Sequence, residues 1–220
     1  MADLHYLEEI EFDDSNPESR CACVLLLDVS ASMSGAPIRQ LNEGLVELQT
    51  ALQADDLASM RVELAVVTFG GRVNLHQDFI TANQLELEPV TTSGSTPMGE
   101  AINLGLDMIQ RRKEIYRSNG VSYYRPWIFL ITDGSPTDEW KTAAARVQEA
   151  EASKSVAFFA VGVQKANMNT LNQISTRQAV KLQGLHFQEM FVWLSESLRS
   201  VSHSQVGDQV PLAPPGWAEV

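Results

Sequence analysis

The chain has 220 residues, of which 44% are hydrophobic and 20% are charged, and 28 acidic residues outweigh 16 basic ones to give a formal net charge of −12. A chain of this length and apolar content can build the core of one α/β domain, which excludes a disordered acidic protein. The charge argues against nucleic acids and anionic membranes as partners, because proteins bind both through lysine and arginine.

The sequence shows no membrane or secretion signal. No apolar run approaches the roughly 18 residues that a spanning helix needs. The N-terminal stretch MADLHYLEEIEF lacks the basic and apolar regions of a secretory signal. Cys21 and Cys23 would point to the same face of a strand, so we expect them to be small buried side chains in a reducing cytoplasm. Metal or redox use is the alternative, although the other ligands of a soft site are missing.

The first part of the chain predicts an arm, a strand and a helix. Residues 1–20 form an acidic arm whose alternating apolar residues fit either an edge strand or a loosely packed tail, with a turn or linker over Asp13–Arg20. Cys21–Asp28 is an apolar run that ends in a polar turn, which is typical of a buried strand. A helix with Pro37 in its first turn follows and is expected to end near Asp55.

The middle of the chain predicts a β-hairpin and a long helix. Arg61–Phe69 and Arg72–Ile80 have strand patterns joined by two glycines, and the alternation in the second favours an antiparallel edge strand. Residues 81–93 have no regular pattern. Pro97–Arg117 has the pattern of an amphipathic helix, and Thr96 stands before it at the N-cap position.

Strand and helix patterns continue to alternate in the second half. Further strands are expected at Tyr124–Thr132, Ser155–Val163 and Val180–Leu182. Helices are expected from Trp140 to Val147, with Thr137 or Asp138 as the cap, at Asn169–Ser175 and at Leu185–Val201. The alternation predicts an α/β fold with a doubly wound, mostly parallel sheet, one antiparallel edge strand and helices on both faces.

Residues 21–203 would form this domain, and no second domain or internal repeat is visible. Residues 204–220 are too rich in proline for regular structure. They predict either a disordered tail or a segment that docks Trp217 on the body of the protein or on a partner.

Polar side chains follow two of the predicted strands and precede one helix. Asp28, Ser30 and Ser32 follow the first strand, Thr96 precedes Pro97, and Asp133 follows the strand that ends at Thr132. The carboxyl ends of strands in such sheets open into a crevice, so we expect these three loops to meet. Carboxylate and hydroxyl oxygens suit Mg²⁺, Mn²⁺ or Ca²⁺ rather than zinc or copper. Each loop alone is more typical of a turn or a helix cap, so the prediction depends on the combination.

This combination resembles the metal-ion-dependent adhesion site of von Willebrand factor A domains, whose pattern is D-x-S-x-S, then a threonine, then an aspartate. The resemblance covers about residues 20–203 and implies the same α/β fold. It implies Mg²⁺, or Mn²⁺ or Ca²⁺, bound by Asp28, Ser30, Ser32, Thr96 and Asp133. In the family, an acidic side chain of a partner protein completes the coordination shell, so the site would be a docking point rather than a catalytic centre.

Four stretches look like the bacterial tellurite-resistance, TerY-like group of this family: LLLDVSASMSGAPI, SGSTPMGEA, RPWIFLITDGSPTDEW and LAPPGWAEV. That resemblance implies a cytoplasmic adaptor in a stress or tellurite-resistance system, with a protein kinase and a PP2C-type phosphatase as partners.

An enzyme is the main alternative. A Mg²⁺-dependent phosphohydrolase could use the same oxygens, but no general base or nucleophile accompanies them, and metal-dependent phosphatases need a second carboxylate where Ser30 stands. No phosphate-binding loop or nucleophile elbow is present. The four histidines, His5, His76, His186 and His203, lie far apart in the sequence and do not have the spacing of metal ligands.

A third hypothesis is a regulatory domain whose metal is bound but takes no part in partner binding. Asp138 and Glu139 could also rim the crevice, although capping a helix is the role we expect for Asp138.

Overall fold

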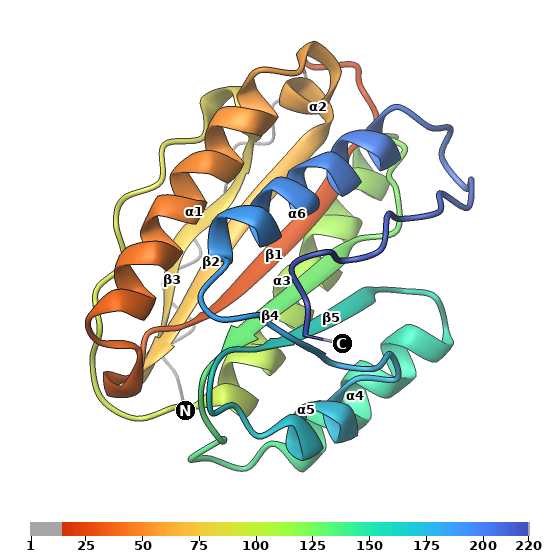
Figure 1. Cartoon of the computed structure of the whole chain (residues 1–220). Coiled ribbons are helices and arrows are strands. Elements are labelled where there is room, and N and C mark those ends of the chain that lie inside the picture. The colour runs from red at the N-terminus through yellow and green to blue at the C-terminus, as the bar shows by residue number, and fades with distance from the viewer. Residues whose placement is uncertain (1–14, 220) are drawn as a thin grey trace.

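The computed structural model describes residues 15–219, which fold into a six-stranded sheet with helices on both faces (Figure 1). The strands are β1 Cys21–Asp28, β2 Val62–Gly70, β3 Arg72–Thr81, β4 Trp127–Thr132, β5 Ala157–Gly162 and β6 Val180–Lys181. The helices are α1 Ala36–Gln53, α2 Asp56–Arg61, α3 Met98–Ser118, α4 Lys141–Ala152, α5 Met168–Ile174 and α6 Phe187–Ser202. Short 3₁₀ turns occupy Ala31–Met33 and Ala82–Gln84.

The strand order is β3-β2-β1-β4-β5-β6, and every neighbouring pair is parallel except β2 and β3. The predicted doubly wound sheet with one antiparallel edge strand is therefore confirmed. Every residue of β1 and β2 is buried, whereas most of β3 is only partly buried. Helices cover both faces of the central strands, which is why those strands are continuous apolar runs in the sequence.

Two hydrophobic cores lie on opposite faces of the sheet. Alternate residues of β1 contribute to each, with Leu25 and Leu27 in the core under α1 and α6, and Val24 and Leu26 in the core under α3, α4 and α5. In Figure 1, α1 and α6 lie side by side over the first face. None of the helices within residues 15–219 is both long and apolar enough to cross a bilayer.

Both cysteines are free and fully buried in the core under α1 and α6. Burial, and to a smaller extent the charge of Glu63, raises the pKa of the Cys21 thiol to about 12. A thiol with so high a pKa stays protonated and unreactive at neutral pH. The structure therefore confirms the expectation that these residues are small core side chains.

A buried charge cluster joins β2 to α3 and to the segment before β1. Glu63 accepts hydrogen bonds from Arg20 Nε at 3.1 Å, from Arg112 Nε at 2.7 Å and from the Tyr116 hydroxyl at 2.5 Å. All four side chains are almost completely buried. The linker predicted at Asp13–Arg20 thus ends in a residue that is locked into the fold.

Helix α2 is absent from the sequence prediction, which ended the preceding helix near Asp55. The Asp55 carboxylate accepts hydrogen bonds from the Leu57 and Ala58 amides and caps α2. So short a helix has too few turns to show an apolar repeat. Its cap, Asp55, was therefore interpreted as the end of the preceding helix. The predicted strands Tyr124–Thr132 and Ser155–Val163 are also shorter than expected, because β4 begins at Trp127 and β5 at Ala157.

The C-terminal segment docks on the domain. Trp217 is 4% exposed and makes an edge-to-face contact with Trp193, with ring centroids 5.7 Å apart. Its carbonyl accepts a hydrogen bond from the Gln183 amide at 2.9 Å, and Leu182 forms an antiparallel bridge with Ala218. Of the two alternatives for residues 204–220, the disordered tail is therefore wrong, and Trp217 packs on the body of the protein. The edge strand considered within residues 1–20 lies mostly outside the described residues.

Candidate metal site

The predicted site residues come from loops that the sheet brings together. Strands β1 and β4 are parallel neighbours, with Leu27 opposite Ile131, so their carboxyl ends lie side by side. Asp28 ends β1, and Asp133 follows directly after β4. The loop before α3 supplies Thr96 to the same edge of the sheet. This edge is where open α/β sheets expose side chains for binding.

Hydrogen bonds link four of the five predicted ligands into one chain. The Ser30 amide donates to Asp28 Oδ1 at 2.8 Å, and the hydroxyls of Ser30 and Ser32 share a hydrogen bond of 3.0 Å. The Ser32 hydroxyl then donates to Asp133 Oδ1 at 2.7 Å, across 101 residues of sequence. Asp28, Ser30 and Asp133 are buried, whereas Ser32 is exposed. The oxygens therefore converge on a point that solvent reaches from the side of Ser32.

Thr96, the fifth residue, borders the same space. A Cβ atom placed on Gly134 would lie 3.5 Å from Thr96 Oγ1 and 3.8 Å from Asp28 Oδ2. The backbone of Thr96 is held by Thr137, whose amide donates to the Thr96 carbonyl at 3.0 Å and whose hydroxyl accepts from the Thr96 amide at 3.1 Å. The structure thus brings all five predicted residues together.

The predicted helix caps differ from those in the structure. Thr96 is not the N-cap of α3, which begins after Pro97 without a side-chain cap from that position. Instead, the Asp138 carboxylate accepts hydrogen bonds from the Gly99 and Glu100 amides. Glu139 takes the role that we assigned to Thr137 or Asp138, because it accepts from the first amides of α4. The hydroxyl of Thr96 is therefore left for the site, and Asp138 ties α3 to the loop after β4.

Thr132 is a functional neighbour that the sequence analysis missed. Its hydroxyl donates to Asp28 Oδ2 at 2.5 Å and accepts from the Gly134 amide at 3.2 Å. Thr132 is fully buried, so it orients Asp28 rather than facing a ligand. One signal was available, since Thr132 is the one polar residue in the apolar strand WIFLIT.

The two carboxylates of the site have no basic partner in the part of the chain that the structure describes. No ion pair within residues 15–219 includes Asp28 or Asp133. Burial raises the pKa of Asp28 and the charge of Asp133 adds to this, whereas hydrogen bonds from Ser30 and Thr132 act in the opposite direction. Buried carboxylates are usually paired or bind a metal. A divalent cation between them would supply the missing positive charge.

The donor set fits a hard cation. Its five members offer only carboxylate and hydroxyl oxygens, and Mg²⁺ takes about six oxygens and keeps several waters. Within the described part of the chain, no group of three or more His, Cys, Asp or Glu side chains is placed to hold a metal. Any metal here therefore depends on the hydroxyls. With only five protein donors, a bound cation would keep a position for an oxygen from outside.

Comparison with known families settles what kind of domain carries this site. The model of the von Willebrand factor type A domain matches residues 23–191, a range that contains all five site residues. The chain belongs to the von Willebrand factor type A family. Domains of this family are generally binding modules without catalytic activity, and a divalent metal at the metal-ion-dependent adhesion site is typical of them.

Individual relatives are distant. Inter alpha-trypsin inhibitor heavy chain 4 from Mus musculus is 28% identical over 124 residues, which are 52% of this chain and 12% of that protein. The pilus adhesin SpaC from Lactobacillus rhamnosus GG superposes with a TM-score of 0.69 at 14% identity, covering 84% of this chain and 31% of that one. Proximal thread matrix protein 1 from the mussel byssus, with a zinc-occupied metal-ion-dependent adhesion site, gives a TM-score of 0.54 at 14% identity, over 83% and 48% of the two chains. Such low identities to the solved structures show the fold alone.

Proposed function

We propose that this chain is a divalent-cation-dependent protein-binding module whose metal site accepts a carboxylate from a partner. The observation that carries the proposal is that the Asp28 and Asp133 carboxylates, which have no ion pair within residues 15–219, meet three hydroxyls at an edge that solvent reaches. Neutral hydroxyl ligands leave a bound cation only partly neutralised, so it attracts a further anionic oxygen. The cation supplies the electrophilic point, and Asp28, Ser30, Ser32, Thr96 and Asp133 would hold it.

Mg²⁺ is the ion that we propose, with Mn²⁺ or Ca²⁺ as substitutes, because every donor is a hard oxygen. The mussel byssus protein has zinc in the corresponding motif. Zinc therefore belongs in the binding test, even though the site lacks the nitrogen and sulfur ligands that zinc prefers.

We further propose a cytoplasmic role in a bacterial stress or tellurite-resistance complex, with a protein kinase and a PP2C-type phosphatase as partners. The four TerY-like stretches support this context.

The test is capture of partners from a bacterial lysate with the full chain, in Mg²⁺ and in EDTA. Ser30→Ala/Ser32→Ala removes two candidate metal ligands, and Ser118→Ala/Ser200→Ala is the matched control, because those serines are exposed and their hydroxyls donate to carbonyls of their own helices. We expect a protein that the wild type and the control capture in Mg²⁺ but that is lost in EDTA and with the Ser30/Ser32 variant. Capture of the same proteins in every condition would mean that the metal is idle and the interface lies elsewhere.

The enzyme hypothesis is tested alongside. Turnover of phosphoesters that requires Mg²⁺ and disappears in Asp28→Ala would overturn the binding-module proposal. We expect no such turnover, because the sequence contains neither a phosphate-binding loop nor a nucleophile elbow.

A further inference from the structure

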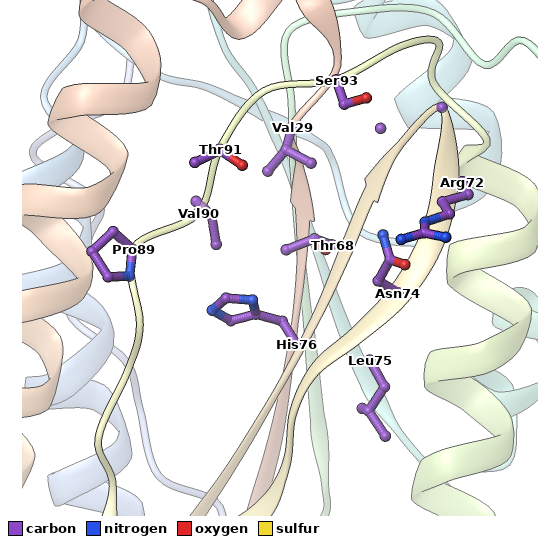
Figure 2. Close-up of a pocket in the computed structure, with 12 residues that line it drawn as sticks. Val29, Thr68, Arg72, Asn74, Leu75, His76, Pro89, Val90, Thr91 and Ser93 are labelled. Atoms are coloured by element: carbon purple, nitrogen blue, oxygen red, sulfur yellow. The ribbon is translucent and has the colours of Figure 1, made fainter. Parts of the chain in front are cut away.

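A polar groove of about 630 Å³ opens between the β2–β3 hairpin and the segment 89–93 (Figure 2). Its lining includes Val29, Thr68, Arg72, Asn74, His76 and Thr91. In Figure 2, Thr91 and Arg72 stand on opposite sides of the opening, with Thr68 and His76 between them. The groove has the size of a small-ligand pocket but a mostly polar lining, which suits a peptide segment better than an apolar molecule.

The groove adjoins the loops that carry the candidate metal site, although none of the five candidate ligands lines it. Val29 lies between the ligands Asp28 and Ser30, and its carbonyl accepts a hydrogen bond from the Ser93 amide at 2.7 Å. The Ala31 amide donates to the Gly94 carbonyl at 3.0 Å. The loop that forms one wall of the groove therefore runs directly into Thr96.

Close backbone packing fixes the wall nearest to the metal. A Cβ atom on Gly70 would lie 2.5 Å from the Ser93 carbonyl oxygen and 2.6 Å from that of Val29, so only glycine allows this approach. The Gly71 amide also donates to the Ser95 carbonyl at 2.7 Å. The hairpin, the end of β1 and the loop before α3 are thus held as one unit.

Side-chain amides of α1 hold the outer wall. Asn42 donates to the Val90 carbonyl at 3.0 Å and accepts from the Val90 amide at 2.8 Å. Further along α1, Gln49 accepts from the Leu87 amide and Gln53 donates to the Leu85 carbonyl. These contacts replace the backbone partners that an irregular segment lacks. The groove is therefore preformed, which reduces the conformational entropy that is lost on binding.

The groove carries positive charge on a strongly acidic protein. Arg72 is exposed, and no ion pair joins it to a carboxylate within the part of the chain that the structure describes. Among residues 15–219, no acidic residue lines the groove, although the chain as a whole has a net charge of −12. Glu88, directly before the segment 89–93, contacts His76 through its backbone carbonyl, and its side chain is exposed to solvent.

His76 adds a second polar group that the backbone holds in place. Its Nε2 lies 2.8 Å from the Glu88 carbonyl oxygen, and since a carbonyl can only accept, Nε2 carries the proton. His76 has no partner on β2, because the pairing shifts there from Val67–Leu75 to Val66–Gln77. Such bulges redirect side chains and are common beside binding sites.

We propose that the groove is a second anion subsite for the same partner. An acidic peptide segment would place one carboxylate on the metal and a second carboxylate against Arg72, with Asn74 and His76 beside it. This inference rests on the proposed function, because the metal provides the first contact. Arg72 is suited to the second, since its guanidinium can make two parallel hydrogen bonds to one carboxylate.

The probes are two series of short peptides added to the full chain in Mg²⁺. One series is acetyl-Asp-(Gly)n-Asp-amide with n from one to five, and the other has Asn in place of either Asp. Binding is followed by chemical-shift titration. The two-carboxylate peptide with the best spacer length should bind about three- to fivefold more tightly than the one-carboxylate peptides of the same length. This is the gain expected for one exposed Arg–carboxylate pair.

Variants separate this inference from the proposed function. Arg72→Gln should remove the advantage of the second carboxylate, and Arg72→Lys should keep part of it. Arg111→Gln, which removes an equal charge from the exposed face of α3, should leave the advantage intact. If one- and two-carboxylate peptides bind equally well in Mg²⁺, the subsite is refuted and the metal-dependent function stands. If neither series binds in Mg²⁺, both proposals fail together.

Discussion

Gly134→Ala separates metal binding from stability at the candidate site. The added methyl would meet nothing closer than 3.5 Å, and Gly134 has an ordinary negative φ, so the metal-free fold accepts it. Replacing glycine where alanine fits stabilises a protein by about 0.4–1 kcal/mol, because the unfolded chain loses freedom. The metal-free variant should therefore be slightly more stable than the wild type.

Metal binding should change in the opposite direction. The methyl would stand 3.5 Å from Thr96 Oγ1 and 3.8 Å from Asp28 Oδ2, on the side where these oxygens face a common space. Mg²⁺ sits about 2.0–2.1 Å from its ligands, so a cation coordinated by Thr96 on that side would be too close to the methyl. We expect Mg²⁺ affinity to fall at least about tenfold, which corresponds to about 1.4 kcal/mol.

Two measurements on the same sample test the prediction. Urea unfolding in EDTA gives the free energy of unfolding, and calorimetric titration with MgCl₂ gives the affinity. Gly216→Ala is the matched control, because a Cβ there meets no atom within 4 Å and the residue lies in the C-terminal segment. Unchanged Mg²⁺ affinity in Gly134→Ala would refute the placement of the cation between Thr96 and Asp28.

Three further predictions concern the scaffold. Glu63→Gln removes the carboxylate that two buried guanidinium groups share and should lower the free energy of unfolding in urea by about 3–5 kcal/mol, whereas Glu114→Gln, on the exposed face of α3, should change it little. Trp217→Ala should cost about 3–5 kcal/mol in the same assay without changing Mg²⁺ affinity; a loss below about 1 kcal/mol would mean that the tail is not docked. Although burial acts to raise it, hydrogen bonds from Ala58, His203 and Arg199 lower the pKa of Asp55 to about 2. Stability from the Asp55 carboxylate should thus be complete above about pH 4 and lost toward pH 2, and a pH series of urea melts should show a shallower acid loss in Asp55→Asn.

The caps around α3 show where sequence reasoning failed. A threonine before a proline-initiated helix is a reasonable local cap, and Asp138 is a reasonable cap for the helix that follows it. In the structure Asp138 caps α3 from 39 residues away, and Glu139 caps α4. Local patterns consider only neighbours in sequence, whereas an orphan helix amide bonds to whichever acceptor the fold brings near.

The sequence also could not predict that the C-terminal segment docks on the domain or that the groove exists. Proline-rich composition predicts a segment without regular structure, which is what residues 204–217 mostly are, but not whether it packs. Trp217 docks because Trp193 of α6 and the edge after β6 offer it an aromatic contact and backbone partners. The groove needs β3, the end of β1 and the segment 89–93 to come together, and no single stretch of sequence contains it.

The sequence by itself determined the alternating strands and helices, the antiparallel edge and the identity of five candidate ligands. Apolar periodicity and the D-x-S-x-S, threonine and aspartate pattern involve residues that are near one another in sequence or occur in a fixed order. They can therefore be recognised without a structure. Only the tertiary structure decided that Thr132 donates a hydrogen bond to Asp28 and that the two site carboxylates have no basic partner within residues 15–219. It also decided that a polar groove carrying Arg72 adjoins the loops of the site. Those features depend on distances between segments far apart in sequence, and such distances are fixed only when the sheet brings its strand ends together.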